Sequence, residues 1–284
     1  MNGKIIYLNV KPQISLFGTM FALRNKKLTY TFEGNVYPIL LNFMSTTELK
    51  QKRLEIEIDW KEEDLIKEDA IELSHLFEDC TSLECMSLDF NFNLSHVNKI
   101  IRMFKGCSSL KAAPDISTLD TKNVKDLTEM FKDCQLLISL PNISKLDTFK
   151  VNFMSSIFQN CASLIILPDI SKWNVCRVMN LAYVFMNCSS LIALPDSSKW
   201  RTGYAIRLDG LFSGCLSLTP IPDISQLDTA NVESMYGMFS YLTLEYLPDI
   251  SKWNTSKVEN ISDMFLIAKQ YLKCMKFPNG MLEM

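Results

Sequence analysis

A phenylalanine returns every 27 residues along most of this chain, and no other feature limits its fold as strongly. The series is Phe77, Phe104, Phe131, Phe158, Phe185, Phe212 and Phe239, and Phe265 follows after 26 residues. In all but the last two turns a cysteine comes three residues after the Phe and a leucine six residues after it. Repeats of this length are typical of chains that stack similar turns on one another. The sequence therefore predicts an elongated solenoid.

Each repeat predicts one short helix and one short strand. The apolar residues of one turn recur at helical spacing, at Val124, Leu127, Met130, Phe131 and Cys134, with Thr121 or Asn123 placed to cap the helix start. The segment Leu137–Ile143 looks short and extended, because its proline cannot donate to a strand ladder. One strand and one helical piece per turn of this length is the leucine-rich-repeat plan. We therefore expect an α/β repeat solenoid of the leucine-rich-repeat kind.

The chain divides into three predicted regions. Residues 1–66 lack the repeat. Four segments of this region look like strands: Ile5–Val10, Ile14–Phe17, Leu28–Phe32 and Leu54–Trp60. This region is expected to be a small, mainly β cap that shields the first turn. Residues 67–265 hold seven to eight solenoid turns, and residues 266–284 form a degenerate last turn or tail.

Charge and cysteine spacing exclude several function classes. The net charge of −3, with both signs spread along the chain, argues against a nucleic-acid partner, which would need a basic excess. The cysteines lie 27 residues apart rather than at zinc-ligand spacing, so we expect a reduced, packed column and no metal. No catalytic residue and no cofactor are predicted. His75 and His96, the only histidines, have no partner at a motif spacing, so a hydrolase site is not expected.

Two polar or aromatic columns have both a functional and a structural interpretation. An acidic column could line a cation site, although Asp after proline usually bonds nearby backbone in a turn, and we favour the turn. Its members are Asp115, Asn142, Asp169, Asp196, Asp223 and Asp249. Trp173, Trp200 and Trp253 could stack on sugars or bases. Because leucine occupies their position in other turns, as at Leu119 and Leu146, core packing is the better interpretation.

The N-terminal sequence has no apolar run of signal-peptide length, and no segment is long and apolar enough to span a membrane. The chain as given is therefore expected to be cytoplasmic. A cell-surface location would follow if a leader precedes it.

The repeat resembles that of the BspA-like leucine-rich-repeat surface proteins. The matching string is Met-Phe-x-x-Cys-Ser-Ser-Leu-x-x-Leu-Pro-Asp-Ile-Ser-Lys-Trp-Asn-Thr, best seen at Phe158–Asn174, Phe185–Trp200 and Pro248–Val258, and the match covers about residues 70–265. The resemblance implies a right-handed solenoid without catalytic residues and, in surface members, adhesion to host or matrix proteins. The chain departs from the pattern at Ser197, where isoleucine is expected, and at Arg201, where asparagine is expected.

One variable position suggests where a partner binds. The two residues after the first leucine of each strand should point outward, and in the middle turns they include Ile138, Ile165, Ile166 and Ile192. Lys111 borders this stripe on one side, and Glu245 and Tyr246 border it on the other. An exposed apolar stripe with a polar rim marks an interaction site, unless other parts of the chain cover it.

Three functions remain open. The first is a non-enzymatic module that binds a protein partner through its repeat surface. The second is an extracellular adhesin of the BspA type, and the third is a substrate-recruiting subunit of an enzyme complex. The identity of the partner and the oligomeric state are not predicted.

Overall fold

The structure is a computed structural model of the whole chain. It describes residues 5–8, 20–24, 27–31, 53–58, 71–75, 77–81, 83–90, 97–117, 119–195, 200–219, 221, 223–242 and 249–266. The predicted strand Ile14–Phe17 and the tail 267–284 lie outside the described residues.

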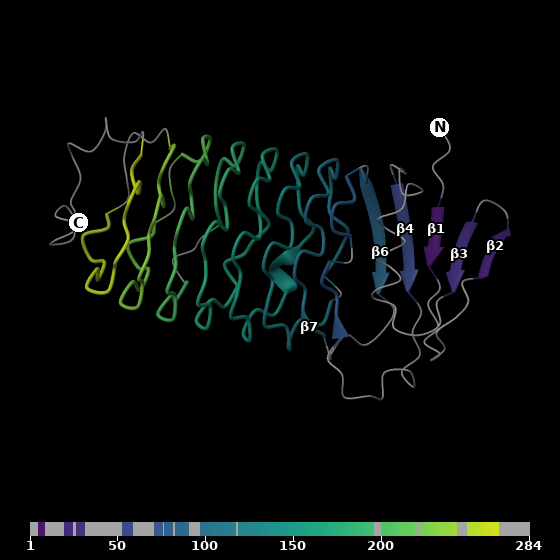
Figure 1. The fold of residues 1–284 in the computed structure, drawn as a ribbon, viewed down its shortest axis with the longest axis horizontal. Helices are drawn as coiled ribbons and strands as arrows, with labels where there is room; N and C mark the ends of the chain where they lie inside the picture. Colours follow the sequence, from purple (N-terminus) through teal and green to yellow (C-terminus); the bar gives the residue numbers. More distant parts are fainter. Residues whose placement is uncertain are drawn as a thin grey trace.

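Successive repeats lie side by side along the long axis of the molecule, each turn a narrow loop of chain (Figure 1). Isolated parallel bridges connect residues at the same position in neighbouring turns. One column of bridges joins Lys99, Asp126, Phe153, Asn180, Arg207, Ser234 and Asn260 in that order. A second column includes Cys85 with Ala112, Ala112 with Ser139, and Ile166 with Ala193. The 27-residue period of the sequence is thus the period of the backbone pairing.

The N-terminal region carries strands, as the alternating pattern predicts. Strand β3 (Lys27–Thr31) pairs in parallel with β1 (Ile5–Leu8) and antiparallel with β2 (Met20–Arg24), a strand that the sequence pattern missed. Strand β4 (Arg53–Ile58) pairs in parallel with β6 (Cys85–Phe90), and β5 (Ile71–Glu72) pairs with β7 (Val97–Lys99). Since β6 lies in the first repeat, the β4–β6 pair joins residues on either side of the predicted boundary at residue 66.

The helix expected in each turn does not form in the described residues. Their only helix is a single 3₁₀ turn, η3 (Ile143–Lys145). In the predicted helical segment the backbone N–H groups of Leu127, Glu129 and Phe131 donate to carbonyls of the next turn, at 2.9 to 3.0 Å. An α-helix would use each N–H for the carbonyl four residues back. The bonds between turns therefore replace the helix.

The residues proposed as helix caps have other partners. The Oγ1 atom of Thr121 accepts a 2.7 Å bond from the backbone N–H of Asp147, one turn further along. The Oδ1 atom of Asn123 accepts a 2.6 Å bond from the Nζ of Lys150, also in the next turn. Both side chains therefore bridge adjacent turns instead of closing the end of a helix.

Two positions in each turn adopt the left-handed backbone conformation, two residues before and two residues after the repeating Phe. Around Phe131 they are Glu129, with φ of 58°, and Asp133, with φ of 63°. Positive φ is unusual for residues other than glycine and is best tolerated by Asp and Asn. These two reversals give the segment a zigzag course, which also rules out a continuous helix.

The core is built from columns of identical side chains. The repeating Phe rings stack nearly parallel from Phe77 to Phe265, with centroids 5.2 to 6.0 Å apart and interplanar angles of 5° to 15°. Trp173 extends the stack sideways, 6.4 Å from the ring of Phe158. Offset-stacked aromatic pairs each contribute about 0.5–1.5 kcal/mol beyond their buried area. Every turn thus adds one more layer to the same apolar column.

The cysteines form a second buried column beside the phenylalanines. The thiol of Cys161 donates to the backbone carbonyl of Phe131 at 3.1 Å, and the other cysteines from Cys107 to Cys215 repeat this bond at 2.9 to 3.1 Å. Among the described residues no disulfide is formed. Burial raises the pKa of the Cys215 thiol to about 12 and that of Cys161 well above its usual range. These thiols are protonated packing groups, as the 27-residue spacing predicts.

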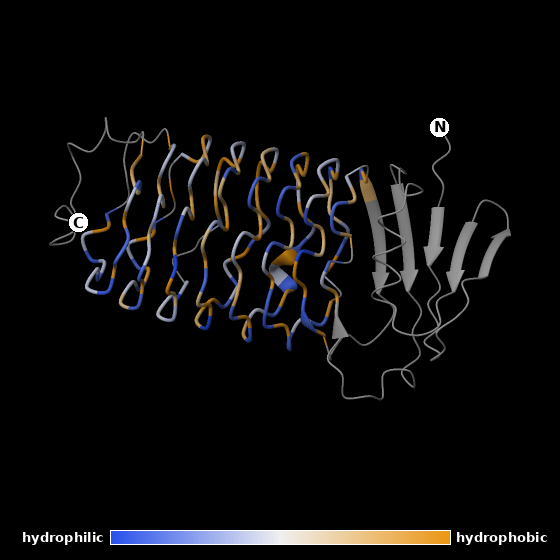
Figure 2. Cartoon of the chain, viewed as in Figure 1, coloured by the Kyte–Doolittle hydropathy of each residue, from blue (hydrophilic) through white to orange (hydrophobic). Residues whose placement is uncertain are grey.

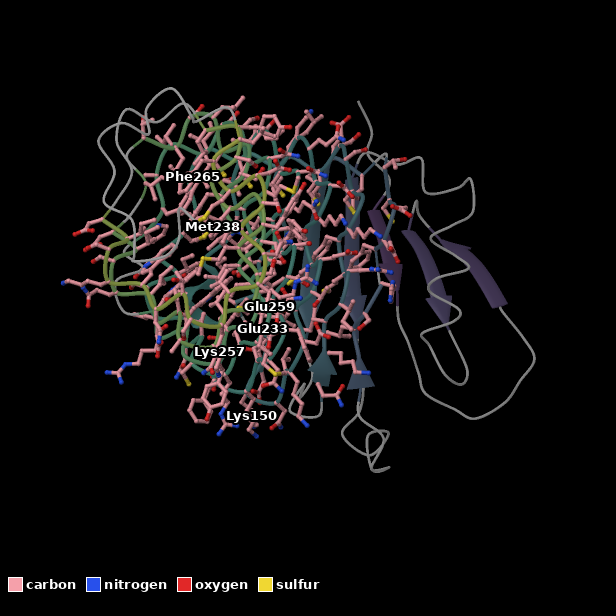
Figure 3. All side chains as sticks on the ribbon, turned by 60° about the vertical axis from the view of Figure 1, so that its left-hand side comes forward. Lys150, Glu233, Met238, Lys257, Glu259 and Phe265 are labelled. Atoms are coloured by element: carbon pink, nitrogen blue, oxygen red, sulfur yellow. The ribbon has the colours of Figure 1, made fainter. Side chains whose placement is uncertain are left out.

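Polar residues occupy the outside of each turn. Figure 2 shows that the repeats carry both apolar (orange) and polar (blue) segments. In Figure 3, Lys257 and Glu233 lie in the lower half of the solenoid, and Met238 and Phe265 lie above them. Neighbours in one polar column are joined through their backbones, since the N–H of Glu259 donates to the carbonyl of Glu233 at 2.7 Å. Backbone hydrogen bonds between neighbouring turns therefore hold these surface side chains at a fixed, short spacing.

Candidate binding surface

The four isoleucines of the predicted stripe are exposed. Ile138 is 47% exposed, Ile165 44%, Ile166 55% and Ile192 50%. We call these four residues the isoleucine patch. Their exposure is well above that of the leucines just before them in the chain, because Leu137, Leu164 and Leu191 are all 0% exposed. The two positions after each buried leucine thus face solvent in these turns.

The backbone fixes the spacing within the isoleucine patch. The N–H of Ile138 donates to the carbonyl of Lys111 at 3.0 Å, and that of Ile192 donates to the carbonyl of Ile165 at 3.0 Å. Between them, the N–H of Ile165 approaches the carbonyl of Ile138 at 3.4 Å. Strands paired in this way lie about 4.8 Å apart. The patch is therefore a contiguous apolar surface held on consecutive turns.

The polar border of the patch is seen on one side. The side chain of Lys111 is exposed, and its Nζ lies 3.2 Å from an oxygen of Glu84, the residue at the same position one turn earlier. Glu245 and Tyr246, the border predicted on the other side, lie outside the described residues. Thr219, which follows Ile192 in the same column, is exposed.

One exposed apolar residue close to Ile138 in the chain was not predicted. Leu136 is 46% exposed and lies two residues before Ile138. Five other turns have serine at its position, as at Ser109 and Ser163, and the turn that begins at Phe239 does not. A leucine where most turns have serine departs from the repeat. This departure could have identified Leu136 from the sequence as an exposed apolar residue.

The acidic column closes turns, as we expected. The Oδ1 atom of Asp115 accepts a 2.8 Å bond from the backbone N–H of Ser117, and Asp169, Asp223 and Asp249 make the same bond two residues on at 2.9 Å. This backbone bond, with a second one from the Ser117 side chain, lowers the pKa of Asp115. Asp196 lies outside the described residues. Elsewhere in the described chain no group of three or more His, Cys, Asp or Glu side chains is placed to hold a metal ion.

His75 has an acidic partner that the spacing argument did not predict. Its Nδ1 atom contacts a carboxylate oxygen of Glu78, three residues on. The other oxygen of Glu78 lies 3.2 Å from the Nζ of Lys105, and that lysine also lies 3.5 Å from Glu129. Burial favours a higher pKa for Glu78, but its bonds to His75 and Lys105 outweigh burial and lower it. The pair belongs to a cluster of ion pairs across three turns. His96 lies outside the described residues.

A buried carboxylate was also missed by the sequence analysis. Asp209 is 0% exposed and accepts bonds from the Nε of Arg207 at 2.6 Å and from the backbone N–H of Tyr236 at 2.9 Å. The hydroxyl of Ser234 is a third donor. Asp209 replaces the small residues Ser155 and Ala182 of earlier turns. Arg207 lies in the same turn as Asp209, and the other two donors lie in the next turn. The carboxylate therefore joins these two turns and positions Arg207.

The remaining exposed aromatic residues lie apart from the isoleucine columns in the repeat. Tyr204 is 67% exposed, and Phe149 is 48% exposed with the guanidinium carbon of Arg177 5.0 Å from its ring centroid. Trp173, Trp200 and Trp253 are 4 to 6% exposed, so the preference for core packing is confirmed for the tryptophan column.

Comparison with known proteins gives one family. Residues 71–195 and 180–276 match a family described as Mycoplasma protein of unknown function, DUF285. No curated protein and no protein of solved structure matches the chain. Among the described residues there is also no helix long and apolar enough to cross a membrane.

Proposed function

We propose, from the premise that the chain belongs to the DUF285 family, that it is a non-enzymatic module that binds a protein partner through the isoleucine patch. The observation that carries the proposal is the 44 to 55% exposure of four isoleucines on three consecutive turns. Contiguous exposed apolar patches with a polar rim often mark protein–protein interaction sites. The partner expected here is therefore a protein with a complementary apolar surface.

The rigidity of the patch supports this role. Its residues lie on turns joined by backbone hydrogen bonds and packed on the phenylalanine and cysteine columns. A surface that is already ordered loses little conformational entropy when it binds. The leucine-rich-repeat class and the right-handed winding implied by the BspA resemblance form part of the same proposal.

The finer proposal is a BspA-like surface adhesin. Two observations favour it: the likeness of the repeat string to that family, and the match to a family described from Mycoplasma. An adhesin would use the same patch on the outside of the cell. Labelling intact cells with a membrane-impermeant amine reagent distinguishes the two compartments, because only a surface protein would be modified before lysis.

Partner capture from native cells tests the binding role. Tagged wild-type chain is compared with the double variant Ile165→Asp/Ile192→Asp and with a matched surface control, Tyr204→Asp, and the captured proteins are quantified by mass spectrometry. The expected partner is retained by wild type and by Tyr204→Asp, and is lost with the double variant. The purified partner should then bind the double variant about 100-fold more weakly, because each buried charge is expected to cost about tenfold in affinity.

Two results would contradict the proposal. One is a double variant that captures the same proteins as wild type. The other is loss of cooperative urea unfolding in the double variant, which would mean that these isoleucines belong to the core.

A further inference from the structure

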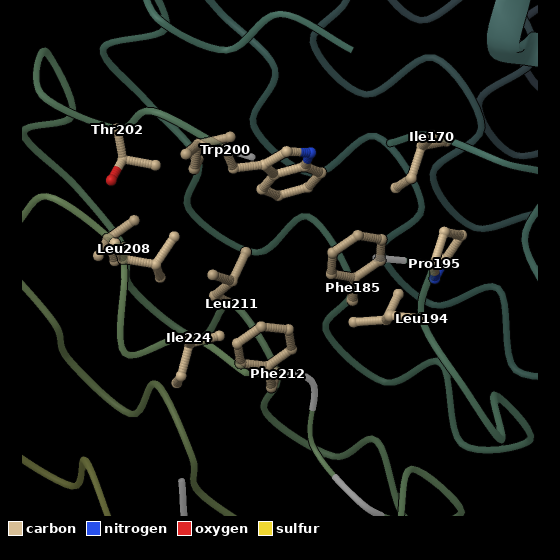
Figure 4. Close-up of a pocket in the computed structure, with 12 residues that line it drawn as sticks. Ile170, Phe185, Leu194, Pro195, Trp200, Thr202, Leu208, Leu211, Phe212 and Ile224 are labelled. Carbon is tan, nitrogen blue, oxygen red and sulfur yellow. The ribbon is translucent and has the colours of Figure 1, made fainter. Parts of the chain in front are cut away.

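The apolar space beside Trp200 (Figure 4) is too small for a ligand. Its volume of about 10 Å³ holds no more than one water molecule. The indole N–H of Trp200 has no acceptor in the described chain, whereas those of Trp173 and Trp253 donate to the carbonyls of Ile143 and Ile224 at 3.1 Å. A ligand of these turns must therefore bind on their surface.

Polar and aromatic departures from the repeat gather on four consecutive turns. Asp209 and Tyr236 occupy a position that holds Ala182 one turn earlier. Tyr183 and Asp263 occupy the next position along the chain, which is glycine in the two turns between them. The turns are joined through their backbones, since the N–H of Tyr183 donates to the carbonyl of Asp209 at 2.7 Å. Side chains at the two positions are therefore neighbours in the folded chain.

The buried carboxylate of Asp209 holds the side chain of Arg207 in place. It accepts a 2.6 Å bond from the Nε of Arg207, while the hydroxyl of Ser234 and the backbone N–H of Tyr236 fix the carboxylate itself. The side chain of Arg207 is 52% exposed, and its guanidinium makes no other hydrogen bond within the described chain. Its two terminal NH₂ groups are therefore oriented donors that a ligand can reach.

Two tyrosines and a second carboxylate surround this arginine. The ring of Tyr183 lies against Gly210, where a Cβ atom would approach its Cδ1 atom to 2.6 Å. Burial, followed by the charge of Asp209, raises the pKa of the Tyr183 hydroxyl. Tyr236 is 40% exposed, and a hydrogen bond to Asp263 raises the pKa of its hydroxyl, with nearby Tyr183 adding to the effect. We call these residues the tyrosine–arginine cluster: Tyr183, Arg207, Asp209, Tyr236 and Asp263.

We propose that the tyrosine–arginine cluster binds a neutral oligosaccharide. Sugar hydroxyls both donate and accept hydrogen bonds, and the cluster offers donors on Arg207 and acceptors on Asp263. The C–H face of a pyranose ring packs on an exposed aromatic ring, and Tyr236 supplies one whose polar tip is also bonded. The charges disfavour an anionic ligand, because one guanidinium stands against the carboxylates of Asp209 and Asp263. Side chains that are already held in place lose little entropy when the sugar binds.

Saturation-transfer NMR and calorimetry on the full chain test this site. The probes are four neutral tetrasaccharides, namely cellotetraose, maltotetraose, mannotetraose and galactotetraose, and tetragalacturonate is the acidic comparison. At least one neutral tetrasaccharide should bind at millimolar concentration, with the strongest saturation at the ring C–H protons that face the tyrosine. Tetragalacturonate should bind more weakly than that probe.

Variants separate the aromatic ring from the donors. Tyr236→Ala removes the ring and should weaken sugar binding about tenfold. Arg207→Lys keeps a cation beside Asp209 but loses the planar pair of donors, so it should weaken binding about three- to tenfold. Phe149→Ala is the matched control, because Phe149 is also an exposed ring beside an arginine, Arg177, in an earlier turn. It should bind the sugar as the wild type does.

Sugar binding and the protein-binding role are tested separately. The double variant Ile165→Asp/Ile192→Asp should bind the tetrasaccharide as the wild type does, even where it loses the protein partner. Three results would overturn the sugar site. One is that no neutral tetrasaccharide binds at millimolar concentration, and another is that Tyr236→Ala and Arg207→Lys bind as tightly as Phe149→Ala. The third is tighter binding of tetragalacturonate than of every neutral probe, which would assign an anionic ligand to Arg207.

Discussion

The phenylalanine and cysteine columns lie within eight residues of the isoleucine patch in the chain, yet only the patch position changes its side chain often from turn to turn. The columns keep the same side chain through almost the whole solenoid, and from Phe77 to Phe239 and from Cys80 to Cys215 they are 0 to 8% exposed. The patch column changes from Lys111 to Ile138 and on to Thr219. A buried position must fit the identical layers above and below it, whereas an exposed position only has to tolerate water. Binding specificity therefore has room to vary at the exposed positions.

The largest effect is expected in the phenylalanine column. Phe158→Ala should lower the free energy of unfolding by about 3–5 kcal/mol, because the ring is 0% exposed and stacks on both neighbouring turns. Phe149→Ala, at a half-exposed ring in the same turn, should cost less than about 1 kcal/mol. Urea unfolding measures both. Equal losses at the two positions would mean that stacking is not what stabilises the column.

The buried carboxylate tests whether burial requires an apolar residue. Asp209→Asn keeps the shape and loses the charge that accepts the bonds of Arg207 and Tyr236, so it should cost about 1–3 kcal/mol. The same substitution at the exposed turn residue, Asp115→Asn, should cost less than about 0.5 kcal/mol, since an amide oxygen can accept the Ser117 N–H. Thermal unfolding of the two variants checks the difference. If Asp209→Asn leaves the free energy of unfolding unchanged, the charge of Asp209 contributes nothing to stability.

The cysteine column predicts a loss of stability at alkaline pH. An unfolded thiol ionises near pH 8.5, whereas burial raises the pKa of folded Cys215 to about 12. The folded state thus keeps a proton that the unfolded state loses, so stability is complete below about pH 8.5 and falls as pH rises towards 12. Cys215→Ala should reduce the slope of unfolding free energy against pH by about 1.4 kcal/mol per unit.

A packing control separates ionisation from loss of volume in that experiment. Leu218→Ala removes a side chain that is 0% exposed in the same turn and carries no proton. Its stability should be lower at every pH with an unchanged slope. If Cys215→Ala and Leu218→Ala give the same slope, the thiol does not cause the alkaline instability.

The smallest effect is expected in the isoleucine patch. Ile165→Asp should change the free energy of unfolding by no more than about 0.5 kcal/mol, because the side chain is 44% exposed. The adjacent Leu164→Asp should prevent folding, since a charge would replace a fully buried leucine. Circular dichroism and urea unfolding compare the two. A large loss of unfolding free energy in Ile165→Asp would show that this patch residue contributes to the core, as Leu164 does.

The predicted helix shows where sequence periodicity misleads. Val124, Leu127, Met130 and Phe131 have helical spacing, and all four are buried. Their burial on one side of a turn does not require a helix, because a zigzag backbone with reversals also brings them inward. The sequence held a signal for one reversal: the residue two after the repeating Phe is almost always Asp, Asn or Gly, which are the residues that tolerate positive φ.

The second reversal carried a weaker signal, because glycine or aspartate stands there only at Gly210, Gly237 and Asp263. Arg102, Glu129 and Tyr183 all have φ near 60° at the position two before the Phe, although none of these residues favours it. The N–H groups of all three bond to carbonyls of the next turn, at 2.7 to 2.9 Å. Contacts between turns therefore impose the conformation, and a single turn read alone does not reveal it.

The sequence by itself determined the 27-residue period, the phenylalanine and cysteine columns, the closing of turns by the acidic column, and the positions of the exposed isoleucines. Each follows from residue type at a fixed spacing, because side chains at equal positions meet in stacked turns. Only the tertiary structure decided that the described residues of the turns form no α-helix, that Asp209 is buried among three donors, and that Trp200 lacks the acceptor of its counterparts. Those outcomes depend on hydrogen bonds between residues in neighbouring turns, and the geometry of such bonds is set only when the turns pack together.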